Sequence, residues 1–146
     1  MTAPPFTLRP ATEDDFPFMR DTKLDGLEPY VRALWGWNRS EQERKARDEF
    51  DPAGRWIVVW DGVDAGYVHI ERQADVVTLA GIYLVPPMRR RGLGAAVIQR
   101  VMDGARAEGK PVALRVLKPN PARRLYERLG FRVVGETQER YFMRSD

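Results

Sequence analysis

The sequence predicts a mixed α/β (α+β) fold, with a central sheet of about six to seven strands and helices on both faces. Apolar patterning predicts the element order β, α, α, β, β, β, α, β, α, β, β, which is typical of a mixed sheet covered by helices. The segment 76–85 is apolar on both faces except at Thr78, as expected for a central strand. A length of 146 residues predicts a single domain, 1–146.

The first part of the chain is predicted to hold a short strand over 6–9 and a helix that begins after Thr12–Asp15. Threonine and aspartate favour the cap of a helix, and Pro17 fits the first helical turn. Gly26 and Pro29 are expected to end this helix.

A second helix is predicted from Ser40–Glu43, which has the composition of a capping box, to about Phe50. Strands over 56–60 and 66–71 are predicted to form a hairpin around the turn 61–64.

The second half alternates strands and helices. After Pro86 and Pro87 stop the central strand, a helix opens near Gly92 and ends at Gly109, with an apolar stripe at helical spacing. Asn120-Pro121 predicts the start of the last helix, and Gly130 its end. The remaining predicted strands cover 112–117, 131–134 and 140–144.

The composition excludes several classes of site. There is no cysteine, which excludes disulfides, thiolate metal sites and a cysteine nucleophile, and the only histidine is His69. We therefore expect no metal. No apolar run approaches about 20 residues, and Met1–Pro5 lacks the features of a signal peptide, so a cytoplasmic protein without membrane contact is expected.

Charge is divided unevenly. Residues 1–75 hold 10 Lys or Arg and 15 Asp or Glu, whereas residues 76–146 hold 14 and 6. The acidic half would favour a cationic partner, and the basic half a polyanion. A nucleic-acid binder would need stacking aromatics on its basic face, and most aromatics lie elsewhere, so we expect no nucleic-acid partner.

The segment 82–94 carries the strongest chemical signal, because it passes from a strand through a glycine-containing loop into a helix. The first amides of a helix have no internal partner, and the helix dipole favours an anion there. Arg89, Arg90 and Arg91 add charge in front of the helix. A phosphorylated ligand is therefore expected at this turn.

Two common phosphate-binding motifs fail on specific residues. A Walker-type loop needs Lys-Ser/Thr after the glycines, where Ala95-Ala96 stand. A dinucleotide fingerprint needs a third glycine where Val97 stands, and no acid occurs from Lys110 to Lys118.

The pattern Arg-x-x-Gly-x-Gly, formed by Arg89, Gly92 and Gly94, resembles the acyl-CoA signature of the GNAT family of N-acetyltransferases. The segment 120–131 is similar to the last helix of that family, and the segments 8–12 and 133–136 also resemble its members. The resemblance covers nearly the whole chain. It implies that two neighbouring parallel strands, ending near Val85 and Leu117, splay apart to form an acetyl-CoA cleft.

The resemblance also implies roles for individual residues. Backbone amides of the loop would bind the pyrophosphate, the strand end would pair with the pantetheine arm and polarise the thioester, and Asn120 would face the pantetheine or cysteamine end. Tyr126 would act as general acid toward the leaving thiolate. If the tyrosine sets the alignment instead, Pro119 takes the place of the asparagine. The expected acetyl-CoA residues are Ile82, Tyr83, Leu84, Arg89, Arg90, Arg91, Gly92, Leu93, Gly94, Ala95 and Asn120.

The general base and the acceptor site stay open. Glu71 is the first candidate base, followed by His69 and Asp75, with a water relay as the alternative. Tyr30, Trp35 and Trp37 are candidates for the acceptor pocket, or the tryptophans fill the core.

The expected reaction is direct transfer of acetyl from acetyl-CoA to a primary amine of a small molecule or peptide, in a ternary complex. A non-catalytic acyl-CoA sensor is the alternative. The protein is expected to be a monomer or a homodimer.

Overall fold

A computed structural model describes residues 5–146, and the expectation about Met1–Pro5 falls almost wholly outside them. The elements follow the predicted order. The strands are β1 (Thr7–Pro10), β2 (Arg55–Trp60), β3 (Val63–Arg72), β4 (Val77–Leu84), β5 (Val112–Leu117), β6 (Arg132–Glu136) and β7 (Arg140–Ser145). The helices are α1 (Phe16–Trp35), α2 (Arg39–Glu49), α3 (Leu93–Ala107) and α4 (Ala122–Arg128), with short 3-10 turns η1 (Glu13–Asp15) and η2 (Pro86–Met88).

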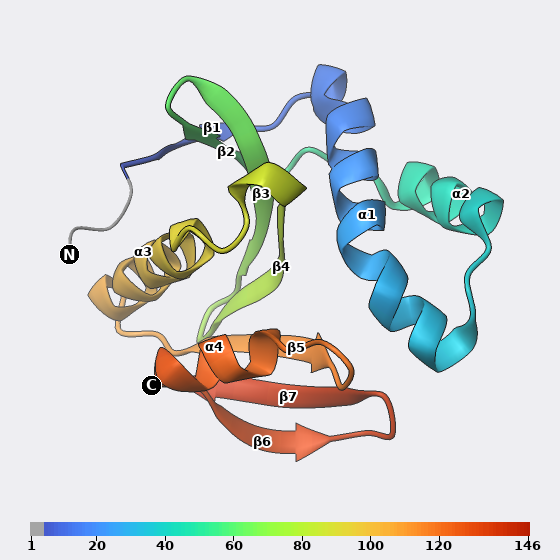
Figure 1. Ribbon diagram of the computed structural model, residues 1–146. Coiled ribbons are helices and arrows are strands. Elements are labelled where there is room, and N and C mark those ends of the chain that lie inside the picture. The colour runs from blue at the N-terminus through green and yellow to red at the C-terminus, as the bar shows by residue number, and fades with distance from the viewer. Residues whose placement is uncertain (1–4) are drawn as a thin grey trace.

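All seven strands form one sheet in the order β1-β2-β3-β4-β5-β7-β6 (Figure 1). Every neighbouring pair is antiparallel except β4 and β5, which run parallel. The predicted central strand β4 is the fourth of the seven. The sheet is therefore mixed, as expected, with its one parallel pair at the centre.

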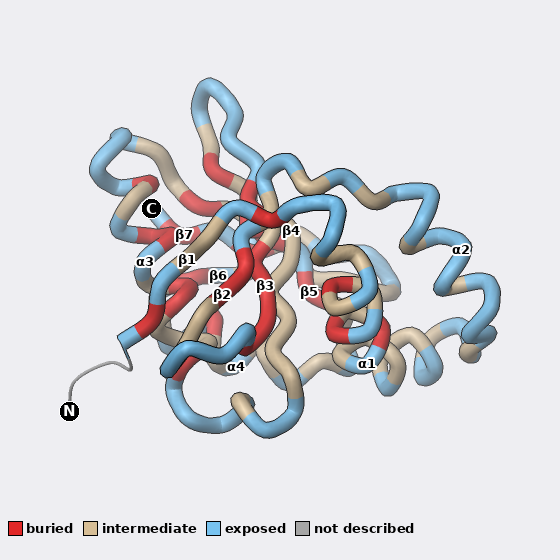
Figure 2. The backbone as a smooth tube through the Cα atoms, turned by 90° about the horizontal axis from the view of Figure 1, so that it is seen from above, coloured by how far each residue is buried: buried red, intermediate tan, exposed pale blue. Residues whose placement is uncertain are grey.

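Helices cover both faces of the sheet. The larger core packs α3 and α4 against one face through the buried side chains of Leu93, Val97 and Tyr126. A smaller core packs α1 against the other face through Met19 and Tyr67. Helix α2 has no buried residue and forms the outer edge of the molecule (Figure 2). Within residues 5–146, no helix combines the length and apolar character that crossing a membrane requires.

The expected end of the first helix is wrong. Helix α1 passes through Gly26 and Pro29 and continues to Trp35, so Tyr30 and Trp35 both lie on this helix. A Cβ on Gly26 would lie 3.4 Å from the Tyr83 ring, so glycine lets the helix lie close to β4. The hydrogen bond lost at Pro29 frees a carbonyl at Asp25, which is exposed. Packing on the sheet therefore overrides the local breakers.

The expected cap of the second helix is also wrong. Asn38, not Ser40, caps α2, and its side-chain oxygen accepts the Glu41 N–H at 3.0 Å. The last helix behaves differently: α4 begins at Ala122, one residue later than expected, but the Asn120 side chain still accepts the Ala122 N–H at 2.8 Å. Asparagine favours this role in both places because its short side chain reaches a free amide of the first turn.

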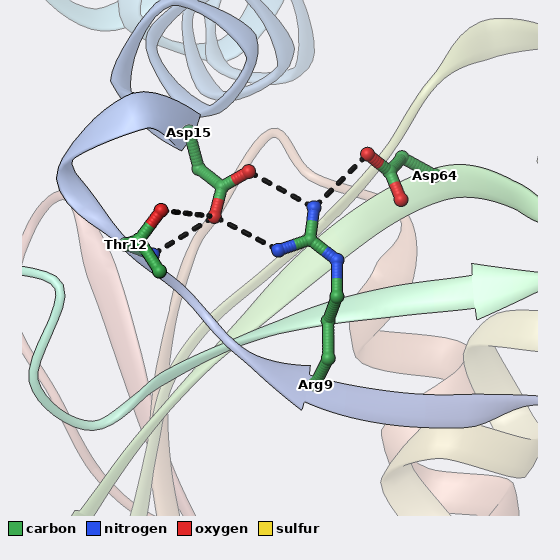
Figure 3. A network of polar contacts seen from close by, with 4 residues as sticks. All are labelled: Arg9, Thr12, Asp15 and Asp64. Carbon is green, nitrogen blue, oxygen red and sulfur yellow. Dashed lines mark hydrogen bonds and ion pairs between the residues drawn. The ribbon is translucent and has the colours of Figure 1, made fainter.

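A polar network ties the first strand to the hairpin of β2 and β3 (Figure 3). Arg9 donates two hydrogen bonds to Asp15, at 2.9 and 3.0 Å, and a third to Asp64 at 3.1 Å. The Arg9 guanidinium lowers the pKa of Asp15. Asp61 and Gly62 both have positive φ, which makes the hairpin turn shorter than the expected 61–64 and lets β3 begin at Val63.

Two glycine substitutions test how closely β3 and β4 are packed. A Cβ on Gly66 would lie 2.1 Å from the Tyr83 carbonyl oxygen and 2.8 Å from Leu84 Cα, both backbone atoms. Gly66→Ala should lower the free energy of unfolding by about 2–3 kcal/mol in urea titration. Gly104, in α3, has open space at its Cβ position, so Gly104→Ala should raise that free energy by about 0.5–1 kcal/mol. Equal effects of the two substitutions would contradict this account.

Candidate active site

A cleft opens where the two parallel strands part. β4 and β5 pair at Val77–Leu79 and Val112–Leu114, and pairing between them ends there within the described chain. The register of β3 and β4 shifts at the same level, because His69 faces Gly81 while Ile70 faces Leu79, which leaves Ala80 as an extra residue in β4. Such a β-bulge bends its strand. The bend at Ala80 thus accompanies the parting, as the expected splay requires.

The cleft has a volume of about 900 Å³. Its walls come from α1, most of β4, β5 and β7, and two residues around α4, Asn120 and Tyr126. Glu49 of α2, Glu71 of β3 and Val134 of β6 complete the lining. Beyond Leu79, the edge of β4 that faces β5 has no strand partner among residues 5–146. Free backbone N–H and C=O groups on a strand edge can pair with an added extended chain.

The loop between β4 and α3 is shaped to receive an anion. Arg90 and Gly92 both have positive φ, 61° and 81°, and Gly92 is the cap of α3. The amides of 90–92 have no backbone partner within residues 5–146. Together with the free amides of the first turn of α3, they form a concave set of donors at the positive end of a helix of 15 residues.

The three arginines of this loop differ in what they contact. Arg89 donates to the Leu84 carbonyl at 2.9 Å and pairs with Asp25 of α1 at 2.7 Å, so its side chain fastens the loop to α1. Arg91 lies over the Trp60 ring, with its guanidinium carbon 5.7 Å from the ring centre. Arg90 is exposed. Unlike Arg89, neither Arg90 nor Arg91 takes part in an ion pair within residues 5–146.

Tyr126 projects from α4 into the cleft. Its side chain is 8% exposed, and its ring packs edge-on against Phe131 at 5.8 Å. Burial raises the pKa of Tyr126 to about 12, and Tyr83 adds to the shift. The hydroxyl therefore keeps its proton at neutral pH.

Side chains alternate along the end of β4. Ile82 and Leu84 pack on the larger core, toward α3. Tyr83 points to the α1 side, where its ring lies 5.3 Å from that of Tyr67. Burial raises the pKa of Tyr83 to about 12 as well. The expected acetyl-CoA residues of β4 thus present a backbone edge to the cleft while their side chains fix the strand on both faces.

The three candidate bases lie in different places. Glu71 lines the cleft and is half exposed. His69 lines a smaller adjoining cavity, and its Nε2 lies 3.6 Å from Glu71 Oε1. Burial, followed by the charge of Arg55, lowers the pKa of His69. Asp75 is exposed and lines neither cavity. Among the three, only Glu71 is both a carboxylate and part of the cleft wall.

Of the three aromatic candidates, only Trp35 lines the cleft. It is 54% exposed at the end of α1, and the Arg140 guanidinium from β7 lies 5.5 Å from its ring centre. Tyr30 and Trp37 line neither cavity. The tryptophans are not among the buried residues of either core, so the alternative that both fill the core is wrong.

Sequence reasoning missed several cleft residues, chiefly Lys23, Glu49 and Arg140. Lys23 is half-buried on the inner face of α1, between the buried residues Met19 and Leu24. A lysine within an apolar stripe was the one available signal. Arg140 carried no local signal, because its place in the wall depends on the approach of β7 to α1.

Comparison with known proteins bears on this geometry. The model of the acetyltransferase (GNAT) family matches residues 17–131. No curated protein matches the chain. Among solved structures, the chain is similar to PaiA N-acetyltransferase from Thermoplasma acidophilum in complex with coenzyme A, with 13% identity over 97% of this chain and 99% of that one and a TM-score of 0.80.

Two Escherichia coli proteins have the same fold. The apo form of YjaB is 16% identical over 96% of this chain and 97% of its own, with a TM-score of 0.76. The ribosomal-protein-S18-alanine N-acetyltransferase is 21% identical over 97% of this chain and 93% of its own, with a TM-score of 0.66.

The buried hydroxyl of Tyr126 should make stability depend on alkaline pH. A tyrosine in the unfolded chain ionises near pH 10.0, whereas folded Tyr126 holds its proton to about pH 12. The free energy of unfolding should therefore fall as pH rises from about 10 to 12. Tyr126→Phe removes this contribution, so urea titrations at pH 9 and 11.5 should show a smaller fall for the variant than for the wild type. An identical fall would show that Tyr126 is not buried as described.

Proposed function

The chain belongs to the acetyltransferase (GNAT) family, whose members depend on acetyl-CoA, and on that premise we propose that it transfers acetyl to a primary amine by direct attack in a ternary complex. One observation carries the proposal. The free edge of β4 beyond Leu79 leads from the cleft to the amides of 90–95, so one strand end joins a site for an extended chain to a site for an anion.

Each part of acetyl-CoA has a matching part of the cleft. The amides of 90–95 would hold the pyrophosphate, with Arg90 and Arg91 adding charge. The backbone of Ile82–Leu84 would pair with the amide groups of the pantetheine arm. Asn120 lines the cleft and uses its side-chain oxygen to cap α4, which leaves its NH₂ group to donate to the pantetheine or cysteamine end.

The proposed chemistry needs no covalent enzyme intermediate. The neutral amine attacks the thioester carbonyl carbon, and a backbone N–H of β4 stabilises the negative oxygen that forms. The C–S bond then breaks, and the thiolate takes the proton of Tyr126. The proton lost by the amine goes to Glu71, directly or through water. Tyr126 regains its proton from solvent, which its raised pKa favours.

The remaining features of the proposal concern the acceptor site and then the protein as a whole. Trp35 forms one wall of the acceptor site, together with Arg140. Tyr30, within α1, and Trp37, just after it, line neither cavity and would take part only if α1 and the chain after it moved. Residues 1–146 act as one transferase domain without a metal. A cytoplasmic location and a monomeric or dimeric state stay predictions from the sequence.

Acetyl-CoA binding should depend on the loop in front of α3. Excess acetyl-CoA should raise the melting temperature of the wild type by several degrees, since a ligand at about 100 times its Kd stabilises by about 2.7 kcal/mol. Replacing Arg90 and Arg91 together with alanine should abolish most of this shift. Arg128→Ala together with Arg132→Ala removes two exposed cations outside the cleft and should leave it unchanged. No shift for the wild type would refute the proposed function.

Tyr126 should act on turnover rather than on binding. Tyr126→Phe should keep the melting-temperature shift with acetyl-CoA but lower kcat by roughly 10²-fold, because the leaving thiolate loses its proton donor. The measurement is thiol release with a chromogenic disulfide, using the best acceptor from a panel of amines. Thiol release that no amine stimulates would favour the sensor alternative. Unchanged kcat in the variant would remove Tyr126 from the mechanism.

A further inference from the structure

A small recess adjoins the cleft on the α1 side. It has a volume of about 60 Å³ and lies between α1, α2, β2, β3 and β4. The recess and the cleft share five lining residues, which are Lys23, Glu49, Ala80, Gly81 and Tyr83. Because Ala80 and Gly81 precede the strand end at 82–84, the recess adjoins the place proposed for the thioester.

The recess gathers basic side chains. Lys23, Arg20, Arg55 and His69 line it, against the single carboxylate of Glu49. Arg20 pairs with Asp21 at 2.9 Å. Neither Lys23 nor Arg55 takes part in any ion pair within residues 5–146, and the Arg55 guanidinium donates only to the Ala53 carbonyl, at 3.1 Å. Two cationic side chains thus face the recess without a carboxylate partner.

The positive charges of these basic groups also oppose one another. Burial lowers the pKa of the Lys23 ammonium, and Arg55 lowers it further against the attraction of Glu49. His69 feels burial, Arg55 and Lys23 in the same direction, while Glu71 and Asp51 oppose them. Buried charge of one sign is unfavourable unless something pairs with it. An anionic group of a ligand would supply the missing partner.

The lining of the wider cleft also carries more basic than acidic side chains. Arg115, Arg140 and Arg144 line it, against Glu71 and the shared Glu49. The acidic composition of residues 1–75 favoured a cationic acceptor, but the residues that line the cleft are mostly basic where they are charged. The excess acids lie elsewhere, such as the exposed pairs of α2, where Glu41 and Asp48 flank Arg44.

On the proposed function, we propose that the acceptor is a small amine that carries a carboxylate, as an amino acid does, and that Lys23 and Arg55 bind this carboxylate in the recess. The recess has room for the group, since its volume of about 60 Å³ exceeds the roughly 10–15 Å³ that one water molecule requires. The rest of the molecule lies in the cleft, whose outer wall offers Leu27, Val31 and Phe142 to an apolar side chain.

A binding experiment tests the recess without turnover. His69 is the only histidine in the sequence, so the untagged protein gives a single set of imidazole signals in an NMR spectrum. These signals report on the recess, because His69 lines it. The probes are sodium acetate and N-acetyl-L-phenylalanine. Sodium chloride is the control for added salt, and N-acetyl-L-phenylalaninamide is the matched control without a charged carboxylate. At fixed pH, both carboxylates should shift the His69 signals and the controls should not.

Lys23→Met identifies the binding group, because methionine keeps the length of the side chain and removes the charge. The Kd of both carboxylates should rise at least tenfold, as expected for loss of a charged hydrogen bond. Lys45→Met, on exposed α2 outside both cavities, should leave the Kd unchanged. The proposal is overturned if acid and amide shift His69 alike, if neither carboxylate shifts it, or if Lys23→Met binds as the wild type does.

Turnover separates this proposal from the function on which it rests. With acetyl-CoA, kcat/KM should be higher for L-phenylalanine than for 2-phenylethylamine, and Lys23→Met should lower the ratio of the two values at least tenfold. A wild type that binds acetyl-CoA but prefers the amine without a carboxylate overturns the carboxylate recess alone. A wild type that fails to bind acetyl-CoA overturns the proposed function instead.

Discussion

The parting of β4 and β5 after Leu79 and Leu114 is the constraint on which the site depends. A continuous parallel pair would fill the centre of the sheet and leave no free backbone. The extra residue Ala80 bends β4 at this level. The other edge of β4 stays paired with β3 up to Leu84. The sheet thus stays continuous on one side and opens on the other, which exposes the edge of β4 over 82–84 and lets Tyr126 reach the cleft from α4.

The two ends of the opened region favour anions by different physical means. In front of α3, backbone amides turned by the positive φ of Arg90 and Gly92 act together with the helix dipole. On the α1 side, half-buried side chains of Lys23 and Arg55 supply whole charges. Arg89 links the two regions mechanically, since it holds the loop to Asp25 of α1. The proposed acceptor would therefore meet a basic wall at the end of the cleft away from the pyrophosphate.

The sequence predicted those parts that local signals determine. The apolar stripe of α3, the apolar strand β4 and the glycines around Gly92 each act within a few residues, and the structure has these elements in place. The length of α1 was not predictable, because its contact with Tyr83 outweighs Gly26 and Pro29. The bulge at Ala80 depends on the register between β4 and β3. The recess is lined by Lys23 from α1 together with Arg55 from β2 and His69 from β3. Features made by contacts between distant segments leave no local pattern to read.

Amide hydrogen exchange with and without coenzyme A, followed residue by residue, tests the central claim most directly. Addition of coenzyme A should slow exchange at the amides of 82–84 and 90–95, because the ligand pairs with the free edge of β4 and with the start of α3. Exchange in the outer strands β1 and β6 should change little. Protection confined to other segments, or no protection under conditions where coenzyme A is bound, would contradict the claim that the parting of β4 and β5 is the binding site.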